Sequence, residues 1–327
     1  MNNHIQHIEI SNFKSIKDLK IDDCKKINVL VGFPNAGKSN ILEALAVHQY
    51  CLDDARVQSQ NDFDFEKYEL KDIVRFEKFS DLFYDGNFNK NTKLVFNNYF
   101  VNIEMNKKNY SYEFGLIDKN NTTDIPFVKK YIFNENNSSS SSKDLINLSY
   151  PFGENLGQII SSNPELRNSV NQFFVQNNLK LLIERGTNEL KIFKEYQDGT
   201  VFTLPYNMIA DTLQRLIFYK TAIMSNHDSV LLFEEPEAHC FEPYILEFTN
   251  EVKYNENNNQ FFIVTHSDFI IQELLRDEES KNNTQIFLVN NVDGETKIKK
   301  LDAEKNEEVY EYGMNVFFNF ENLWENN

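Results

Sequence analysis

The sequence predicts an α/β fold with a mixed, largely parallel central sheet, a small antiparallel β meander and a short helical subdomain. Three short apolar runs carry this prediction: INVLV at 27–31, SVLLF at 229–233 and QFFIV at 260–264. Their length and composition are typical of strands that are buried on both faces of a sheet. The first run leads into a glycine loop and a segment with helical spacing, and the other two end at polar side chains.

The N-terminal part of the chain predicts alternating strands ahead of the first buried strand. Apolar and polar residues alternate through residues 5–21, which is the pattern of half-buried strands. The segment ILEALAVHQYCL at 41–52 has apolar residues at helical spacing. Residues 53–67 are acidic and polar, so we expect them to form a surface excursion.

The middle of the chain predicts a β/helical lobe, inserted at about 53–204 into a single head that spans residues 1–327. Residues 92–118 alternate and are rich in Val, Ile, Tyr and Phe, which predicts the antiparallel meander. The polar, serine-rich stretch at about 134–143 cannot bury apolar area, so we expect it to be a mobile loop.

Further helices and strands complete the prediction. Residues 154–177 predict two short helices, the second of which begins at Pro164 because proline favours the first helical position. Residues 179–204 predict strands around a glycine turn, residues 209–225 a helix, and residues 285–291 a further strand.

Composition limits the classes of function. The chain has 33 Lys and Arg against 50 Asp and Glu, which gives a formal net charge of −17. This charge argues against a protein whose whole surface binds nucleic acid or an anionic membrane. A local basic patch stays open. No apolar run is long enough for a membrane helix, and the N-terminus lacks the features of a signal peptide. Cys24, Cys51 and Cys240 lack metal-ligand or disulfide spacing, which fits a cytoplasmic protein.

The segment GFPNAGKS at 32–39 matches the phosphate-binding pattern G-x-x-x-x-G-K-[ST] at every fixed position. Its glycines let backbone N–H groups point at phosphate oxygens, and the following helix adds its positive end. Lys38 is expected to reach the β- and γ-phosphates of a nucleotide, and the Ser39 hydroxyl to bind Mg²⁺. The predicted nucleotide-binding residues are Gly32, Pro34, Asn35, Ala36, Gly37, Lys38, Ser39 and Asn40.

Two carboxylates, Glu234 and Glu235, directly follow the buried run at 229–233. A single acid at a strand end is commonly just solvated, but two acids directly after five apolar residues are less common. In a nucleotide site one carboxylate holds the metal and the next polarises the attacking water. We therefore assign Glu234, with Ser39, to Mg²⁺ and Glu235 to the water as a catalytic base.

His266 follows the predicted strand at 260–264, so it is expected at the same edge of the sheet as Glu234 and Glu235. A lone histidine is more often structural. At the carboxyl end of a parallel strand beside a phosphate site, however, it can contact the γ-phosphate. His266 is therefore the second candidate catalytic residue.

Four segments together resemble the ATPase heads of the ABC superfamily, in the group that contains SMC, RecF and overcoming-lysogenization-defect (OLD) ATPases. The segments are IEISNFKSIKDLKI at 8–21, GFPNAGKSNILEAL at 32–45, LLFEEPEAH at 231–239 and IVTHS at 263–267. The resemblance implies an ABC-type P-loop head with ATP and Mg²⁺ as cofactors. The spacing of these segments leaves no room for a long coiled coil, and the tail after IVTHS is too short for a Toprim nuclease domain.

The resemblance also implies a role for each matching residue. Lys38 and Ser39 match the Walker A lysine and serine, and Glu234 matches the Walker B acid. Glu235 matches the general base and His266 the switch histidine.

The chain departs from the family pattern at two places. The Walker B acid is usually Asp, and Glu234 carries one more methylene. The family signature S-x-G-x-x-R aligns here with the sequence Ala210-Asp211-Thr212-Leu213-Gln214-Arg215. The Ser and Gly that normally reach the γ-phosphate of the opposite subunit are therefore absent. We therefore expect a weakened ATP-dependent dimer and slow hydrolysis.

Taken as a family member, the chain is expected to be a stand-alone ATPase head that forms an ATP-dependent homodimer and controls a separate effector protein. Such heads are similar to the ATPase components of bacterial anti-phage systems. Two alternatives stay open. One is an ATP-binding scaffold that hydrolyses poorly, which the degenerate signature favours. The other is a RecF-like DNA-repair ATPase, against which the net charge counts.

Overall fold

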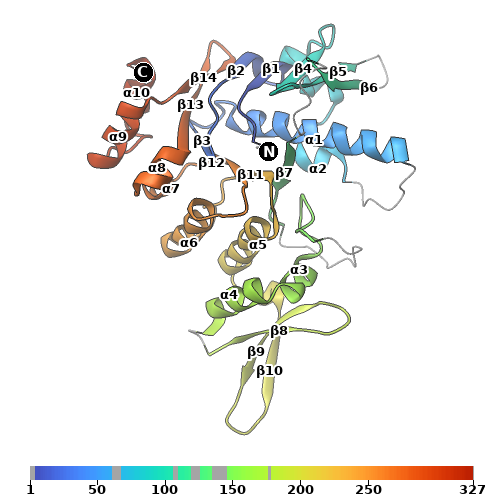
Figure 1. Ribbon diagram of the computed structural model, residues 1–327, viewed down its shortest axis with the longest axis vertical. Helices are drawn as coiled ribbons and strands as arrows, with labels where there is room; N and C mark the ends of the chain where they lie inside the picture. The colour runs from blue at the N-terminus through green and yellow to red at the C-terminus, as the bar shows by residue number, and fades with distance from the viewer. Residues whose placement is uncertain are drawn as a thin grey trace. The chain divides into compact units, whose positions relative to one another are not determined.

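The computed structural model describes residues 4–60, 68–105, 110–118, 126–134, 146–175 and 178–326 (Figure 1). The chain divides into two compact units. The larger contains Met1–Lys130, Asp228–Glu235 and Asn258–Asn327, and the smaller contains Tyr131–His227 and Pro236–Asn257. The smaller unit thus begins at Tyr131, well after the start of the expected insertion. Apart from Asn134, the expected mobile loop lies outside the described residues.

The larger unit is built around a six-stranded sheet with the order β14-β13-β3-β12-β11-β7. Its strands are β3 (Ile27–Val31), β7 (Phe127–Tyr131), β11 (Ser229–Glu234), β12 (Gln260–Val264), β13 (Thr284–Val292) and β14 (Glu295–Lys300). The strands β13, β3, β12 and β11 pair in parallel, and β14 pairs antiparallel with β13. The three apolar runs of the sequence therefore form adjacent parallel strands, as predicted, and all residues of β3 and β12 are buried.

A second, antiparallel sheet in the larger unit has the order β2-β1-β4-β5-β6. Its strands are β1 (Ile8–Phe13), β2 (Ile16–Ile21), β4 (Thr92–Phe96), β5 (Tyr99–Met105) and β6 (Tyr110–Leu116). The predicted meander is confirmed as β4, β5 and β6. Its pairing with β1 joins it to the N-terminal hairpin, a long-range contact that alternation within each segment could not reveal.

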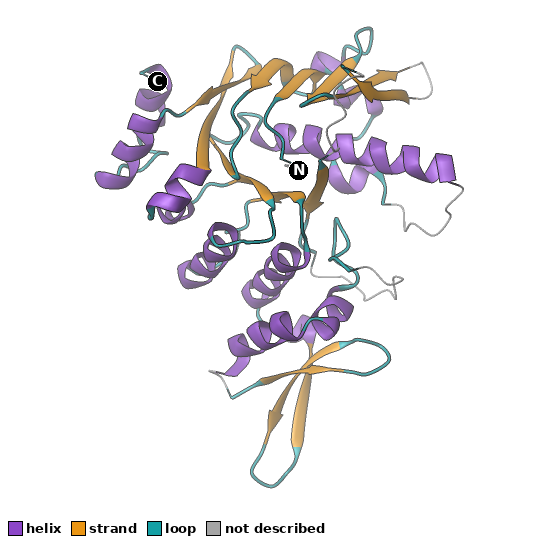
Figure 2. Ribbon diagram, in the orientation of Figure 1, coloured by secondary structure: helices purple, strands orange, loops and turns teal. Residues whose placement is uncertain are grey.

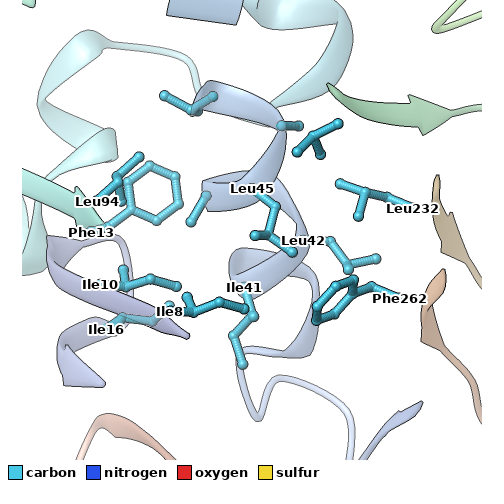
Figure 3. Close-up of a cluster of buried hydrophobic side chains, with 14 of the residues drawn as sticks. Ile8, Ile10, Phe13, Ile16, Ile41, Leu42, Leu45, Leu94, Leu232 and Phe262 are labelled. Carbon is cyan, nitrogen blue, oxygen red and sulfur yellow. The ribbon is translucent and has the colours of Figure 1, made fainter. Parts of the chain in front are cut away.

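Helix α1 (Lys38–Gln60) lies between these two sheets (Figure 3). Its fully buried side chains Ile41, Leu42 and Leu45 contact both layers of the core. The antiparallel sheet contributes Ile8, Ile10, Phe13, Ile16 and Leu94, and the central sheet contributes Leu232 and Phe262. This burial on opposite sides fixes the N-terminal end of α1, and with it the glycine loop, against the central sheet.

The expected surface excursion after residue 52 is wrong for its first part, because 53–60 continue helix α1. Asp53 and Asp54 are buried at 8% exposure. The Asp53 carboxylate accepts a hydrogen bond from Gln49, and the Asp54 carboxylate accepts one from the Tyr112 hydroxyl. These partners stabilise carboxylates that composition alone assigns to the surface. Residues 61–67 lie outside the described residues.

Short helices complete the larger unit. They are α2 (Leu70–Ile73), η1 (Phe79–Leu82), η2 (Tyr84–Gly86), α7 (Asp268–Leu274), α8 (Glu278–Asn283), α9 (Ala303–Glu311) and α10 (Phe320–Glu325). The C-terminal part of the chain after β13 therefore includes β14 and the two helices α9 and α10. Among the described residues, no helix has both the length and the apolar character that a membrane span requires.

The smaller unit combines helices with a three-stranded antiparallel sheet of order β10-β9-β8 (Figure 2). Its elements are α3 (Leu156–Ser162), α4 (Pro164–Val175), β8 (Lys180–Ile183), β9 (Leu190–Glu195), β10 (Val201–Pro205), η3 (Tyr206–Met208), α5 (Asp211–Ser225) and α6 (Glu242–Lys253). The two predicted short helices are confirmed, and α4 begins at Pro164. The Asn163 side chain caps α4 by accepting a hydrogen bond of 3.0 Å from the Leu166 N–H.

Candidate functional site

The glycine loop at 32–37 links β3 to α1 and is held by strand β14. Gly37 has a φ of +98°, and a Cβ placed there would lie 2.0 Å from Oγ1 of Thr296. That hydroxyl lies 2.6 Å from the Ser15 hydroxyl, which in turn accepts a hydrogen bond of 2.6 Å from Asn40. Gly37 is therefore required both by its left-handed backbone and by the close approach of β14.

The remaining residues of the glycine loop differ in their contacts and exposure. A Cβ at Gly32 would lie 2.0 Å from the Val289 carbonyl oxygen, so β13 approaches the loop closely there as well. Ala36 is buried, whereas Pro34 and Asn35 are exposed at the tip of the loop. Asn35 has a φ of +62°, which turns the backbone between these two positions.

Lys38 is 5% exposed, and its ammonium group lies against the backbone of the glycine loop. Its Nζ donates hydrogen bonds to the carbonyl oxygens of Gly32 at 2.8 Å and Phe33 at 2.9 Å. A cation held at the rim of a loop of this kind is placed to meet phosphate oxygens, which are stronger, charge-assisted acceptors than backbone carbonyls.

Ser39 and Glu234 come from the start of α1 and the end of β11, and they meet in the structure. The Ser39 side chain lies near the Glu234 carboxylate and acts to lower its pKa. Hydroxyl and carboxylate oxygens are the hard donors that Mg²⁺ prefers. Among the described residues, no cluster of three or more His, Cys, Asp or Glu side chains could hold a metal ion. A hydroxyl and a carboxylate are ligands that fit a Mg²⁺ ion whose remaining ligands come from phosphate and water.

Two cations contact the Glu234 carboxylate. Arg75 Nη2 lies 2.9 Å from its Oε1, and Lys130 Nζ lies 3.2 Å from its Oε2. Burial acts to raise the pKa of Glu234, but Lys130, the Ser39 hydroxyl and Arg75 together outweigh it, so the pKa lies below its ordinary value. The carboxylate is therefore ionised at neutral pH, as a metal ligand requires.

A buried carboxylate extends this charge network. Glu43, on α1, is fully buried; its Oε1 lies 3.1 Å from Arg75 Nε, and its Oε2 pairs with Lys14. Arg75, Lys130 and Glu43 were not predicted from the sequence. One signal was available, because Glu43 interrupts an apolar helical run, and a buried carboxylate needs a cationic partner. Arg75 gave no such signal, since it follows the short helix α2 in a segment without a motif.

Glu235 and His266 lie at the ends of adjacent parallel strands. The Nε2 atom of His266 lies 3.5 Å from Oε1 of Glu235, whose side chain is half exposed. The Glu235 backbone has a φ of +45°, and its N–H donates to the Val264 carbonyl at 2.8 Å. The His266 ring stacks on Phe317 with centroids 6.2 Å apart. Burial and the charge of Lys38 lower the pKa of His266, although Glu235 acts to raise it, so the ring is neutral at neutral pH.

Five of the predicted residues therefore gather at one edge of the central sheet, where β3, β11 and β12 end. They are Lys38, Ser39, Glu234, Glu235 and His266. This edge is where open α/β sheets usually bind ligands, since it joins the strand ends to helix N-termini.

The degenerate signature segment lies in the smaller unit, at the start of α5. Ala210 occupies the N-cap position. Asp211 forms a 2.9 Å ion pair with Arg215, and the Thr212 hydroxyl donates to the His239 carbonyl at 2.8 Å. Asp211 is thus turned toward an arginine of its own helix, and the Thr212 hydroxyl has a partner within the same unit.

Comparison with known proteins gives two curated relatives, and no family model matches the sequence. An ATP/GTP phosphatase of Helicobacter pylori (strain ATCC 700392 / 26695) is 23% identical over an alignment of 391 positions that covers 97% of this chain and 98% of the relative. An uncharacterized protein of Methanocaldococcus jannaschii is 49% identical over 43 residues, which cover 13% of this chain and 20% of that protein.

Two solved structures share the fold. One is an Smc head bound to the C-terminal winged-helix domain of ScpA, with a TM-score of 0.57 and 16% identity over 92% of this chain and 99% of that chain. The other is an Smc head with an extended coiled coil, bound to the C-terminal domain of ScpA and derived from Pyrococcus furiosus. Its TM-score is 0.56, with 15% identity over 94% of this chain and 98% of that chain. The protein therefore has the fold of an SMC head domain, which confirms the fold that the sequence predicted.

Proposed function

We propose that the protein binds Mg-ATP and hydrolyses it. The observation that carries this proposal is the proximity of Ser39 and Glu234 at the start of the helix that follows the glycine loop, whose carbonyl groups hold the Lys38 ammonium group. A phosphate loop alone occurs in binding proteins, whereas a loop serine beside an ionised carboxylate offers the protein ligands of a magnesium site. The full-length similarity to an ATP/GTP phosphatase supports the same activity.

Each residue has a chemical task in this proposal. Lys38 and the loop N–H groups bind the phosphates, and Ser39 and Glu234 hold Mg²⁺, which supplies charge neutralisation when bound. Glu235 is half exposed, so its carboxylate can accept the proton of an attacking water. His266, with its lowered pKa, presents a neutral ring that can donate one hydrogen bond toward the γ-phosphate.

Replacing Glu235 by glutamine tests the proposal. The amide cannot accept the proton of the water, so Glu235→Gln should retain ATP binding and lose about 10²–10⁴-fold in phosphate release. Glu278→Gln is the matched control, because Glu278 is an exposed acid that pairs with Lys281. Equal turnover by Glu235→Gln and wild type would remove Glu235 as the base. ATP binding without turnover by the wild type would instead favour the scaffold alternative.

We further propose that ATP draws two heads into a weak homodimer. Asp211 and Thr212 are engaged within their own unit, and the family's Ser and Gly are absent, so fewer groups can reach the nucleotide of a second head. The loss of one charge-assisted hydrogen bond costs about 1.5–3 kcal/mol, or roughly ten- to a hundred-fold in dimer affinity. Light scattering of Glu235→Gln with and without ATP should show a concentration-dependent dimer, which Ala210→Ser with Thr212→Gly should strengthen. Identical mass with and without ATP would contradict this proposal.

Control of a separate effector in the cytoplasm, as in the anti-phage systems with OLD-like heads, is the proposed biological role. The solved Smc heads are each bound to a domain of ScpA, which supports the idea that a head of this fold can carry a protein partner. Co-purification of the native protein with the product of a neighbouring gene tests this role. Tight binding of duplex DNA by the purified protein alone would favour the RecF-like alternative instead.

A further inference from the structure

We infer that Arg75 is a positioning residue that pairs with the Glu234 carboxylate and must leave it when Mg²⁺ enters. The inference rests on the proposed function, since it concerns the regulation of the same metal site.

The Glu234 carboxylate is held on both oxygens. Its Oε1 accepts a 2.9 Å hydrogen bond from Arg75 Nη2, and its Oε2 lies 3.2 Å from Lys130 Nζ. The Ser39 side chain lies near the same carboxylate. An ion that takes Glu234 as a ligand therefore competes with these cations for its oxygens.

The two cations differ in their freedom to move. Lys130 is 4% exposed, and its ammonium group also donates to the Ile73 carbonyl at 3.1 Å. Displacing it would leave a buried charge without its partner, which is costly. The Arg75 side chain is 70% exposed, so its guanidinium can move into water at little cost. Arg75 is therefore the exchangeable cation, and Lys130 is the fixed one.

The release of Arg75 leaves no buried carboxylate unpaired. Glu43, the second partner of Arg75, is fully buried, with its Oε1 3.1 Å from Arg75 Nε. The other oxygen of Glu43 pairs with Lys14. Glu43 thus keeps one cation when the guanidinium departs. The Arg75 backbone N–H, 3.3 Å from Glu43 Oε1, can hold the residue in place while its side chain moves.

The balance of charge gives this exchange a direction. Within the network, three cations, Lys14, Arg75 and Lys130, face two carboxylates, Glu43 and Glu234. A divalent ion that enters without phosphates meets a surplus of positive charge, so its binding is disfavoured. Arg75 supplies that surplus. It therefore makes the site accept Mg²⁺ together with nucleotide phosphates rather than alone.

The test measures the binding of a non-hydrolysable ATP analogue by calorimetry over a range of Mg²⁺ concentrations. Arg75→Gln removes the exchangeable cation, so half-maximal binding should need about two- to five-fold less Mg²⁺, the range expected for an exposed ion pair. Arg75→Lys keeps the charge but cannot bridge both carboxylates as a guanidinium does, so its shift should be smaller and in the same direction. Arg276→Gln is the matched control, because Arg276 is 62% exposed and pairs with Glu273 instead.

The direction of the shift separates this inference from a structural role. Loss of a merely structural contact would weaken binding and raise the Mg²⁺ requirement, so an unchanged or raised requirement in Arg75→Gln overturns the inference. If that variant does not fold, as judged by thermal unfolding, Arg75→Lys alone carries the same test. Wild-type protein that does not bind the analogue at any Mg²⁺ concentration removes the proposed function and this inference together. Wild-type binding with no shift in either variant removes the inference alone.

Discussion

Replacing Gly37 by alanine should both destabilise the larger unit and abolish nucleotide binding. The residue has a φ of +98°, which costs about 1–2 kcal/mol for an L side chain. The new Cβ would also lie 2.0 Å from Oγ1 of Thr296 and 2.9 Å from Oγ of Ser15. Relieving such overpacking costs typically about 1–3 kcal/mol, so the free energy of unfolding should fall by about 2–5 kcal/mol.

Two further variants separate these contributions. Gly294, in the turn before β14, has a φ of +85°, and a Cβ placed there would meet no atom within 4 Å, so Gly294→Ala should show the backbone cost alone. Adding Thr296→Ala to Gly37→Ala removes the nearest clashing atoms and should recover part of the loss. Urea unfolding measures stability, and calorimetry measures Mg-ATP binding. If Gly37→Ala is no more destabilising than Gly294→Ala, β14 does not support the loop as described.

Two predictions concern other parts of the larger unit. His48 is buried, its ring nitrogens have no hydrogen-bond partner among the described residues, and burial lowers its pKa to about 3. Because the folded pKa lies below the ordinary value of 6.5, stability should fall as the pH drops below 6.5, by roughly 2 kcal/mol at pH 5. His48→Leu should flatten this dependence in urea unfolding at pH 7 and 5, and an unchanged slope would show that His48 is not its source. The sole tryptophan, Trp324, stacks on Phe320, whose ring lies edge-on to Phe33 of the glycine loop with centroids 5.0 Å apart. ATP should therefore change the intrinsic fluorescence, and Phe320→Leu should weaken the change; equal responses would contradict this coupling.

The parts of the site that could be predicted from the sequence are those encoded in contiguous segments. The glycine loop, its lysine and the two acids at the end of β11 each come at the end of a buried strand, so periodicity and spacing were enough to place them. Their convergence followed from parallel strands, whose carboxyl ends share one edge of a sheet. Helix α1 was placed correctly, but its length was underestimated because Asp53 and Asp54 find partners from other segments.

The residues that could not be predicted act across long separations in the sequence. Arg75 meets Glu43 across 32 positions and Glu234 across 159. Thr296 supports the glycine loop from β14, more than 250 positions further along the chain. Such contacts depend on how the two sheets pack around α1, and no local pattern of residues encodes that packing.

The most direct test of the central claim is calorimetric titration of Mg-ATP into wild-type protein and Lys38→Ala. Lys38 is the cation held over the glycine loop by the carbonyl groups of Gly32 and Phe33. Its removal takes away the main charge-assisted donor for the phosphates, so tight binding by the wild type should be lost in the variant. Equal ATP affinity in the two proteins, with both folded, would contradict the assignment of the loop as the nucleotide site.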